Sequence, residues 1–258
     1  MIFKAAAHHS NVVTSLILRE IITRYGRRGL GFFWLVGEPM MFTVAIIILW
    51  SFIKAPYQHG IRIAPFVMTG YMCLIMFRHM VSYSMAAVSG NTGLLYHKNI
   101  SVLHVYMARY VLEFFGSTLA FFILYTALLG LGQVGIPHNL LLVYWGWFSL
   151  FVLSMGIAMV LSALAAEFEI LERIVPIMLY AVLPFSGVFA MAAWIPAGYR
   201  DVYLAMPLPH PVEMIRAGVF GEFVETHYDP IYPVFCGAIL IVFGLLLLAR
   251  AKEHLDAD

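Results

Sequence analysis

The chain has 258 residues, of which 62% are hydrophobic and 11% are charged. That charged share is about half that of an ordinary soluble domain, so the composition argues against a water-soluble fold. The formal net charge of +1 argues against a nucleic-acid partner, and two cysteines are too few for a disulfide framework.

Six apolar stretches dominate the chain, and each is close to the length of about 20 residues that a helix needs to cross a hydrocarbon core of ~30 Å. They are Phe32–Ile53, Ile63–Met80, Val111–Leu131, Leu140–Ala165, Ile174–Phe189 and Ile231–Ala249. Six helices and their connections use nearly the whole chain and leave no room for a second globular domain. We therefore predict an all-α integral membrane protein, with a six-helix transmembrane domain over 30–258 and a cytoplasmic tail with an interfacial helix over 1–29.

The first predicted element is an amphipathic helix over Ser10–Tyr25. Its apolar face comprises Ile17, Leu18, Ile21, Ile22 and Tyr25, and its polar face comprises Ser15, Arg19, Glu20, Thr23 and Arg24. This pattern is typical of a helix that lies in the membrane interface, and also of a juxtamembrane helix that only orients the protein. No apolar core follows Lys4, so we expect no cleaved signal peptide.

The first span contains Glu38 and Pro39. Because proline removes a backbone donor, we expect a kink or break at Pro39. A carboxylate so close to hydrocarbon is costly unless it is paired, so Glu38 requires a partner.

The second span places Arg78 among three aromatic residues, Tyr71, Phe77 and Tyr83. Two interpretations stay open. Ring faces and a planar guanidinium suit a path along which sugars and phosphates slide. Alternatively, the rings pack in the core and Arg78 forms an ion pair with Glu38 or with Glu113.

The connection between the second and third spans, Val81–Tyr110, is too long for a minimal turn. It holds Ser89-Gly90-Asn91-Thr92-Gly93 and then Leu94-Leu95-Tyr96-His97-Lys98. We predict a break followed by a short, partly apolar helix exposed to the cytoplasm. Such a surface usually docks against a partner.

The fifth predicted span is short and carries Pro176 and Pro184, and a proline-rich external segment follows from Gly187 to Asp229. Two short helices are expected there, over Tyr199–Met206 and Val212–Phe220, dipping into or lying on the outer membrane face. Non-helical backbone at that depth is tolerated only where it packs on protein or lines a cavity.

Lysine and arginine placement predicts the orientation. With an even number of spans both termini share one side, and that side holds more basic residues than the other. It holds Lys4, Arg19, Arg24, Arg27, Arg28, Lys98, Arg109, Arg173, Arg250 and Lys252, against Lys54, Arg62, Arg200 and Arg216 on the other side. Both termini are therefore predicted to be cytoplasmic.

Several kinds of chemistry lack support in the sequence. No Gly-x-x-x-x-Gly-Lys-Ser/Thr motif occurs, so the chain has no P-loop with which to hydrolyse a nucleotide. The histidines lack metal-ligand spacing, and no serine or cysteine lies in a nucleophile elbow. We predict no catalytic residue and no metal. The acidic run Glu167–Arg173 is interpreted as a solvated hairpin that faces a cytoplasmic partner.

Two parts of the sequence resemble a known family. The opening run from Arg19 to Trp34, which closes in Glu38-Pro39, is similar to the start of type-2 ABC exporter permeases, and in particular to the inner-membrane subunit of bacterial capsular polysaccharide exporters. The matching parts at the far end are Ser186–Phe189, Trp194-Ile195-Pro196 and Pro207–Gly218. Permeases for O-antigen or teichoic acid share the opening motif, so they remain alternatives.

The resemblance implies a homodimer of six-helix subunits in the bacterial inner membrane, with two cytoplasmic ATPase subunits that bind ATP and Mg. It also implies an external re-entrant segment, a periplasmic co-polymerase, an outer-membrane channel and a lipid-linked acidic polysaccharide as substrate. A drug or lipid exporter of the same superfamily is a second interpretation. An integral-membrane enzyme such as an acyltransferase is a third, but it would require clustered polar catalytic residues.

The site residues follow from these patterns. In such permeases the loop after the second helix couples to the ATPase, and the matching residues here are Asn91, Gly93, Leu94, Leu95, Tyr96, His97 and Lys98. A substrate entrance is predicted at Arg24, Arg27 and Arg28, whose guanidinium groups suit phosphate or acidic sugars. Structural roles are expected for Glu38, Pro39, Pro196 and Pro207, although Met206-Pro207 departs from the Asn-Pro of many relatives.

Overall fold

The computed structural model describes residues 2–25, 31–85, 87, 91, 100–221 and 224–255. Its α-helices are α1 (Ile2–Tyr25), α2 (Gly31–Ile53), α3 (Ile63–Met85), α5 (Val102–Gly130), α6 (Leu140–Glu167), α7 (Ile170–Ala181), α8 (Ala197–Leu204), α9 (Pro209–Phe220) and α10 (Tyr232–Leu255). Short 3-10 helices lie at Leu183–Phe185 and Ala192–Trp194, and strands β1 (Tyr57–Gln58) and β2 (Ile61–Arg62) form an antiparallel hairpin.

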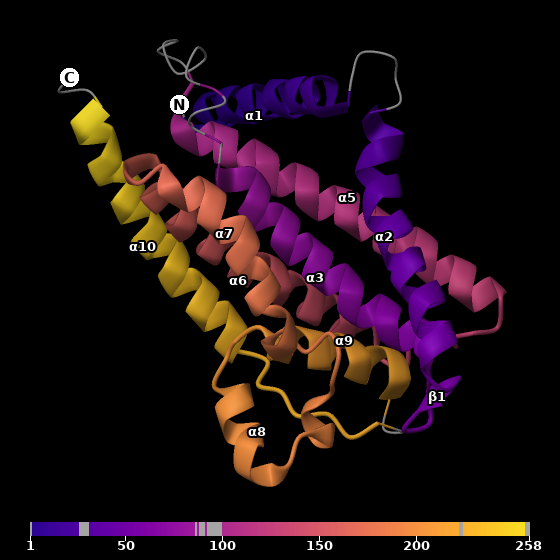
Figure 1. The fold of residues 1–258 in the computed structure, drawn as a ribbon. Coiled ribbons are helices and arrows are strands. Elements are labelled where there is room, and N and C mark those ends of the chain that lie inside the picture. Colours follow the sequence, from indigo (N-terminus) through magenta and orange to yellow (C-terminus); the bar gives the residue numbers. More distant parts are fainter. Residues whose placement is uncertain are drawn as a thin grey trace.

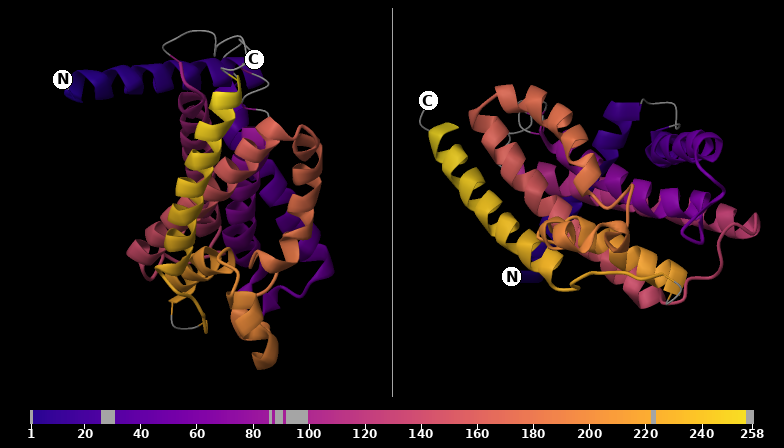
Figure 2. Two further views of the ribbon diagram at one scale, coloured as in Figure 1. Left: turned by 90° about the vertical axis from the view of Figure 1, so that its left-hand side faces the viewer. Right: turned by 60° about the horizontal axis from the view of Figure 1, so that its bottom comes forward.

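The long helices run side by side, and α1 lies across one end of them (Figure 1). Helices α8 and α9 and their loops form the opposite end. The C-terminal end of α10 lies at the end that holds α1, as the left-hand view of Figure 2 also shows. We call these ends the α1 end and the α9 end.

Five helices within the described residues are long and apolar enough to cross a membrane. The spans they offer are Phe33–Ile53, Ile63–Met85, Val102–Gly130, Leu140–Glu167 and Tyr232–Arg250. They match five of the six predicted stretches, because apolar length is the property that a hydrocarbon core selects.

The remaining stretch, Ile174–Phe189, is not one continuous helix. Helix α7 has 12 residues, about 18 Å at the usual rise per residue, and ends at Ala181. Pro184 lies in the following 3-10 helix, and Gly187 adopts a positive φ of 80°. The chain nevertheless runs from the α6–α7 hairpin at the α1 end to the α9 end, where it meets α9 (Figure 1).

Helix α3 forms the centre of the fold, since it packs against α2, α5, α6, α7 and α9. Helices α2 and α10 are peripheral and expose large apolar side chains, as lipid-facing helices do.

Helices α6 and α10 approach closely at two glycines: a Cβ on Gly156 would lie 2.6 Å from the carbonyl oxygen of Gly237. Small residues permit such approach in membranes.

Helix α2 continues through Pro39, so the predicted break does not occur there. The hydroxyl of Thr43, one helical turn further along, donates to the carbonyl of Pro39 itself at 2.8 Å. Pro196 is the N-cap residue of α8, and Pro207 lies in the turn between α8 and α9.

Candidate functional site

The first helix packs on α5 through one of its faces. Leu16 is buried there, and Glu20, four residues later, shares its face by helix geometry. Oε1 of Glu20 forms an ion pair with Nε of Arg109 at 3.1 Å, with the two side chains 12% and 11% exposed. The sequence places Glu20 on the polar face of α1, and in the structure α5 covers this part of that face.

The apolar face predicted for α1 is divided in the structure. Leu18 and Ile22 are exposed, whereas Ile17 and Ile21 line a large apolar cavity with residues of α2, α5 and α6. Its volume is about 1060 Å³. The structure therefore confirms a helix at this place, with part of its predicted apolar face packed on neighbouring helices.

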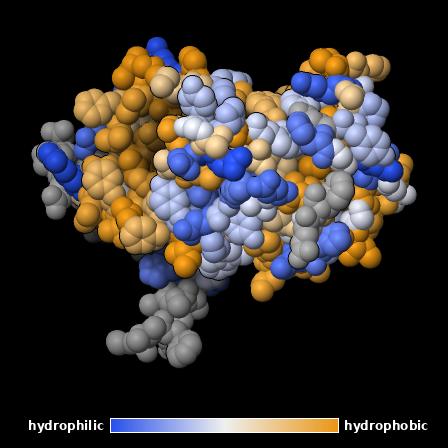
Figure 3. All heavy atoms as spheres, turned by 90° about the horizontal axis from the view of Figure 1, so that it is seen from below, coloured by the Kyte–Doolittle hydropathy of each residue, from blue (hydrophilic) through white to orange (hydrophobic). Residues whose placement is uncertain are grey.

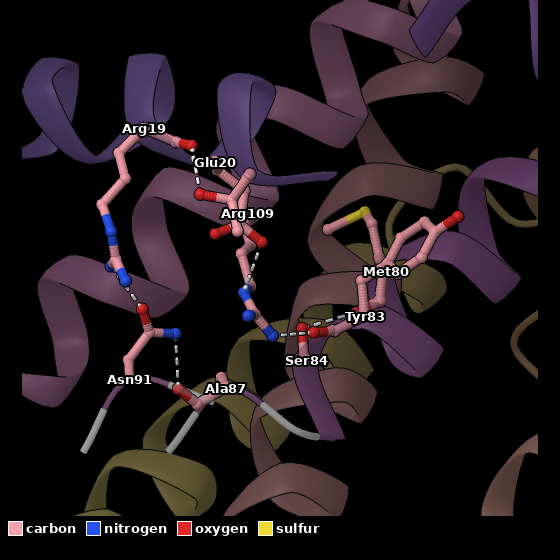
Figure 4. A network of polar contacts seen from close by, with 9 residues as sticks. Arg19, Glu20, Met80, Tyr83, Ser84, Ala87, Asn91 and Arg109 are labelled. Carbon is pink, nitrogen blue, oxygen red and sulfur yellow. Dashed lines mark hydrogen bonds and ion pairs between the residues drawn. The ribbon is translucent and has the colours of Figure 1, made fainter. Parts of the chain in front are cut away.

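Polar contacts join α1, α5 and the end of α3 (Figure 4). Besides its ion pair with Glu20, Arg109 donates through Nη1 to the backbone carbonyl of Tyr83. Nη1 of Arg19 donates to Oδ1 of Asn91 at 2.7 Å, and Nδ2 of Asn91 donates to the carbonyl of Ala87 at 2.9 Å. Asn91 is buried, and its amide joins α1 to Ala87 just beyond α3 through these two hydrogen bonds.

A third contact joins α1 to the start of α5. Nδ1 of His9 lies 2.7 Å from Nε2 of His104, and the two rings stack. His104 also belongs to the capping box of α5, in which the hydroxyl of Ser101 accepts from the His104 backbone. The N-terminal half of α1 is thereby attached to the first turn of α5, at the N3 residue of its capping box.

The predicted coupling segment begins at this cluster. Asn91 is its first residue, and the rest of that prediction (Gly93, Leu94, Leu95, Tyr96, His97 and Lys98) lies outside the described residues. Of the predicted substrate entrance, Arg24 lies in the last turn of α1, while Arg27 and Arg28 lie outside the described residues. Both assignments stay predictions.

Glu38 has polar partners, as its position in the first span requires. The predicted partner Arg78 is not one of them. His79 lies between two carboxylates, with Nδ1 3.3 Å from Glu113 and Nε2 4.0 Å from Glu38. The hydroxyl of Tyr83 donates to Glu38 at 3.5 Å. Successive residues of a helix point about 100° apart. The face of α3 that meets α2 and α5 therefore carries His79, and the adjacent Arg78 points elsewhere.

The four residues of the predicted substrate path do not form one surface. Arg78 lies over the ring of Tyr180 in α7, at 4.3 Å from the ring centroid. Phe77 is buried in the core, and Tyr83 contacts Glu38. Tyr71 lies seven residues before Arg78, so these two share a face of α3. Tyr180 was not among the predicted partners of Arg78, because only the packing of α7 on α3 brings the two together.

The α9 end contains a second polar cluster that sequence reasoning missed. Arg216 of α9 is fully buried, donates to the carbonyls of Gly187 at 2.5 Å and Val188 at 2.8 Å, and lies over the ring of Phe66. Glu213, one turn earlier, accepts from the backbone N–H groups of Ala192 and His227. The available signal was the three-residue spacing of opposite charges within an apolar helix.

Burial and charge act in opposite directions on this pair. Burial raises the pKa of Glu213 and lowers the pKa of Arg216, while each charge favours the ionised form of the other. His210 extends the cluster, since its Nδ1 accepts from the backbone of Asp229 at 2.8 Å and its Nε2 lies 2.8 Å from the carbonyl of Leu204. One face of α9 thus holds the loops around it in place.

The two helices predicted in this segment are confirmed as α8 and α9. Seen from the α9 end, polar side chains gather over the middle of the face, with apolar side chains on either side of them (Figure 3). This arrangement suits a water-facing end of a protein whose flanks contact lipid.

Comparison with known proteins decides the family. Residues 11–220 match the model of the ABC-2 type transporter family. The chain belongs to this family. It is 33% identical over 254 residues to the capsule polysaccharide export inner-membrane protein CtrC of Neisseria meningitidis serogroup B, covering 98% of this chain and 96% of CtrC.

Two further relatives carry similar names. BexB of Haemophilus influenzae, a capsule polysaccharide export inner-membrane protein, is 32% identical over 98% of this chain and 96% of its own length. The polysialic acid transport protein KpsM of Escherichia coli is 24% identical over 93% of each chain. The resemblance inferred from the sequence alone is thereby confirmed at the level of the family.

Proposed function

We propose that this chain is the membrane-spanning permease subunit of an ATP-driven exporter that moves lipid-linked capsular polysaccharide from the cytoplasm to the periplasm. The supporting observation is similarity to CtrC and BexB over nearly the whole length of each chain. Export of O-antigen or teichoic acid, or of a drug or lipid, is the alternative, and the names of these relatives favour capsule.

The proposal includes a six-crossing topology with both termini in the cytoplasm. Five helices in the described part of the chain are long enough to cross, and α7 with the residues up to Phe189 would provide the remaining passage. The α1 end would then be cytoplasmic, and α8, α9 and their loops would form the external, re-entrant segment. This orientation agrees with the excess of basic residues predicted for the α1 end.

The working unit is proposed to be a homodimer in the inner membrane with two cytoplasmic ATPase subunits, which bind ATP and Mg. A periplasmic co-polymerase and an outer-membrane channel would complete the export path. The large exposed apolar side chains of α2, α7 and α10 offer surface for both lipid and a second copy.

Deleting the gene tests the substrate. The expected result is loss of surface capsule with polymer retained inside the cell, and recovery when the chain is supplied from a plasmid. Unchanged capsule with loss of O-antigen or teichoic acid would move the assignment to the alternative exporters. Unchanged amounts of all surface polymers would contradict polysaccharide export.

The purified chain is expected to show no ATPase activity and to gain it only with a co-expressed nucleotide-binding subunit. The reason is that its sequence contains no P-loop, nor even a Gly-Lys dipeptide. Phosphate release, measured with and without the partner, checks this. Hydrolysis by the contaminant-free chain would disprove it.

Changing Arg27 and Arg28 together to lysine is expected to stop export while membrane insertion and dimer formation stay normal. The positive charge that sets topology, and that attracts anionic lipid by about 1 kcal/mol per residue, is kept. The bidentate contacts that arginine makes with phosphate or carboxylate are lost. Surface and cytoplasmic polysaccharide are compared, and wild-type surface polymer in the variant would restrict these arginines to topology.

A further inference from the structure

Arg78 is a charged residue inside the apolar span of α3. It lies seven residues before the end of that helix at Met85, which is about 10 Å along the helix axis. The sequence offered Glu38 and Glu113 as partners, but both carboxylates lie against His79 instead. Within the described residues, Arg78 forms no ion pair. A charge in a membrane span is costly, and an arginine retained there marks a candidate binding site.

The main described contact of the Arg78 guanidinium is the ring of Tyr180 in α7, whose centroid lies 4.3 Å from Cζ. A cation–π contact stabilises the charge but supplies no oxygen to the N–H groups. Nε of Arg78 is buried and has no hydrogen-bond partner in the described part of the chain. The two Nη groups are not buried in this way, so they can reach a ligand between α3 and α7.

Arg216 shows how the chain completes a guanidinium that lies over a ring. Its Cζ is 4.1 Å from the ring centroid of Phe66, and its Nη groups also donate to the carbonyls of Gly187 and Val188. Arg78 has the ring, but the described residues supply none of the oxygens. A guanidinium presents its donors in a planar fork that matches a carboxylate or a phosphate. An oxyanion from outside the chain would therefore complete the Arg78 site.

Two tyrosine hydroxyls extend this site. Tyr71 lies two helical turns before Arg78 on the same face of α3, and it interacts electrostatically with both Arg78 and Tyr180. Tyr180 is 56% exposed and Tyr71 is partly exposed. Neither hydroxyl forms a hydrogen bond within the described residues. Because a phenol hydroxyl both donates and accepts, the two can bind the hydroxyls of a sugar whose acidic group lies on the guanidinium.

We propose that Arg78, Tyr180 and Tyr71 form an anion-binding site that takes the carboxylate or phosphate groups of an acidic polysaccharide and makes the permease prefer acidic to neutral polymer. This inference rests on the proposed function and adds a chemical basis for substrate choice. The guanidinium binds the oxyanion through two parallel N–H···O contacts. Phe77 and Tyr83 are not part of this site, since one is buried in the core and the other contacts α2.

The test compares binding of a short sialic acid oligomer with binding of its carboxyl-reduced form, which is neutral and otherwise alike. The permease complex is held in phosphatidylcholine nanodiscs. The wild type should bind the acidic form about tenfold more tightly, the scale of a charge-assisted hydrogen bond. Arg78→Gln should bring this ratio close to one. Arg78→Lys should keep part of it, because the charge remains and the planar fork is lost. A partly unfolded sample lowers both bound amounts together and leaves the ratio of affinities unchanged.

Two further variants separate the parts of the site. Tyr180→Phe keeps the ring beneath Arg78 and removes one hydroxyl, so both oligomers should bind about fivefold more weakly at an unchanged ratio. Lys54→Gln is the matched control, because Lys54 is an exposed cation that also lies beside a ring, 5.8 Å from the centroid of Trp50. It should leave the ratio unchanged. An equal fall of the ratio in Lys54→Gln and Arg78→Gln would show that overall charge, and not this site, attracts the polymer.

An anionic lipid headgroup offers the same phosphate chemistry, so a second measurement separates the two sources. Native mass spectrometry with phosphatidylglycerol present should find equal amounts of retained lipid in the wild type and in Arg78→Gln. Loss of this lipid in Arg78→Gln, together with equal affinity of the wild type for the two oligomers, would assign the site to lipid and overturn the proposal.

The outcomes also separate this site from the proposed function. If deletion of the gene abolishes capsule export but the wild type binds both oligomers equally, only the proposal for Arg78 fails. A tenfold preference that persists in Arg78→Gln would overturn it as well. If deletion leaves every surface polymer unchanged and the wild type binds neither oligomer, the proposed function itself fails.

Discussion

Replacing Arg216 by alanine is expected to destabilise the protein by about 3–5 kcal/mol, the usual cost of removing one partner from a buried ion pair. Arg216 is fully buried, and its loss leaves the carbonyls of Gly187 and Val188 without their donor. Glu213 would keep a buried negative charge whose main counter-charge is gone. The loops between α7 and α10 should detach from α9.

Thermal unfolding in detergent and limited proteolysis of the segment 182–231 measure this effect. Arg216→Lys keeps the charge but cannot contact two carbonyls in the same way, so an intermediate loss is expected. Arg200 provides a matched control, since it donates to carbonyls of the same segment but is only partly buried. Arg200→Ala should cost about 1 kcal/mol. Equal losses in the two alanine variants would show that burial of Arg216 is not the cause.

Replacing Leu95 and Tyr96 together by aspartate is expected to release the ATPase or to abolish export, with the permease still folded in the membrane. An apolar patch on a cytoplasmic loop has reason to be buried against a partner, and two carboxylates would prevent that burial. Copurification of the ATPase subunit and the amount of surface polysaccharide check the result.

The control for this variant uses exposed apolar residues at the other end of the molecule. Tyr199 and Val202 of α8 are 72% and 69% exposed, so Tyr199→Asp with Val202→Asp should leave ATPase binding unchanged. If export persists in the Leu95 and Tyr96 variant, the coupling contact lies elsewhere. The α6–α7 hairpin is then the next candidate, since it exposes Phe168 and Ile170.

The class of the protein and most of its long helices could be predicted from sequence because they depend on local properties. A run of apolar residues must be long enough to match the hydrocarbon core, and that length is visible without any knowledge of neighbours. The amphipathic repeat of α1 and the short helices α8 and α9 are also local patterns. The family signature in the opening run and in Pro207–Gly218 led to the correct family for the same reason.

The roles of charged residues depended on which helix lies beside which. A helical wheel places Glu20 on the polar face of α1, but only the packing of α5 on that face supplies its partner Arg109. Arg78 and His79 are adjacent in sequence but face different helices, so only packing could assign the partner of Glu38 to His79. Residues that differ by one position point about 100° apart, and no composition rule says which direction holds a partner.

The fifth apolar stretch, Ile174–Phe189, also has features that the sequence shows and partners that only packing assigns. Its hydropathy predicted a span and its prolines marked a weakness, and α7 indeed ends at Ala181, three residues before Pro184. The carbonyls freed between Gly187 and Ala190 are satisfied by Arg216, a residue 26 or more positions further along the chain. The sequence by itself determined the membrane class, the long helices and the family. The tertiary structure decided the ion pairs and the partner of the carbonyls beyond α7, because a buried polar group takes its partner from whatever packing brings near.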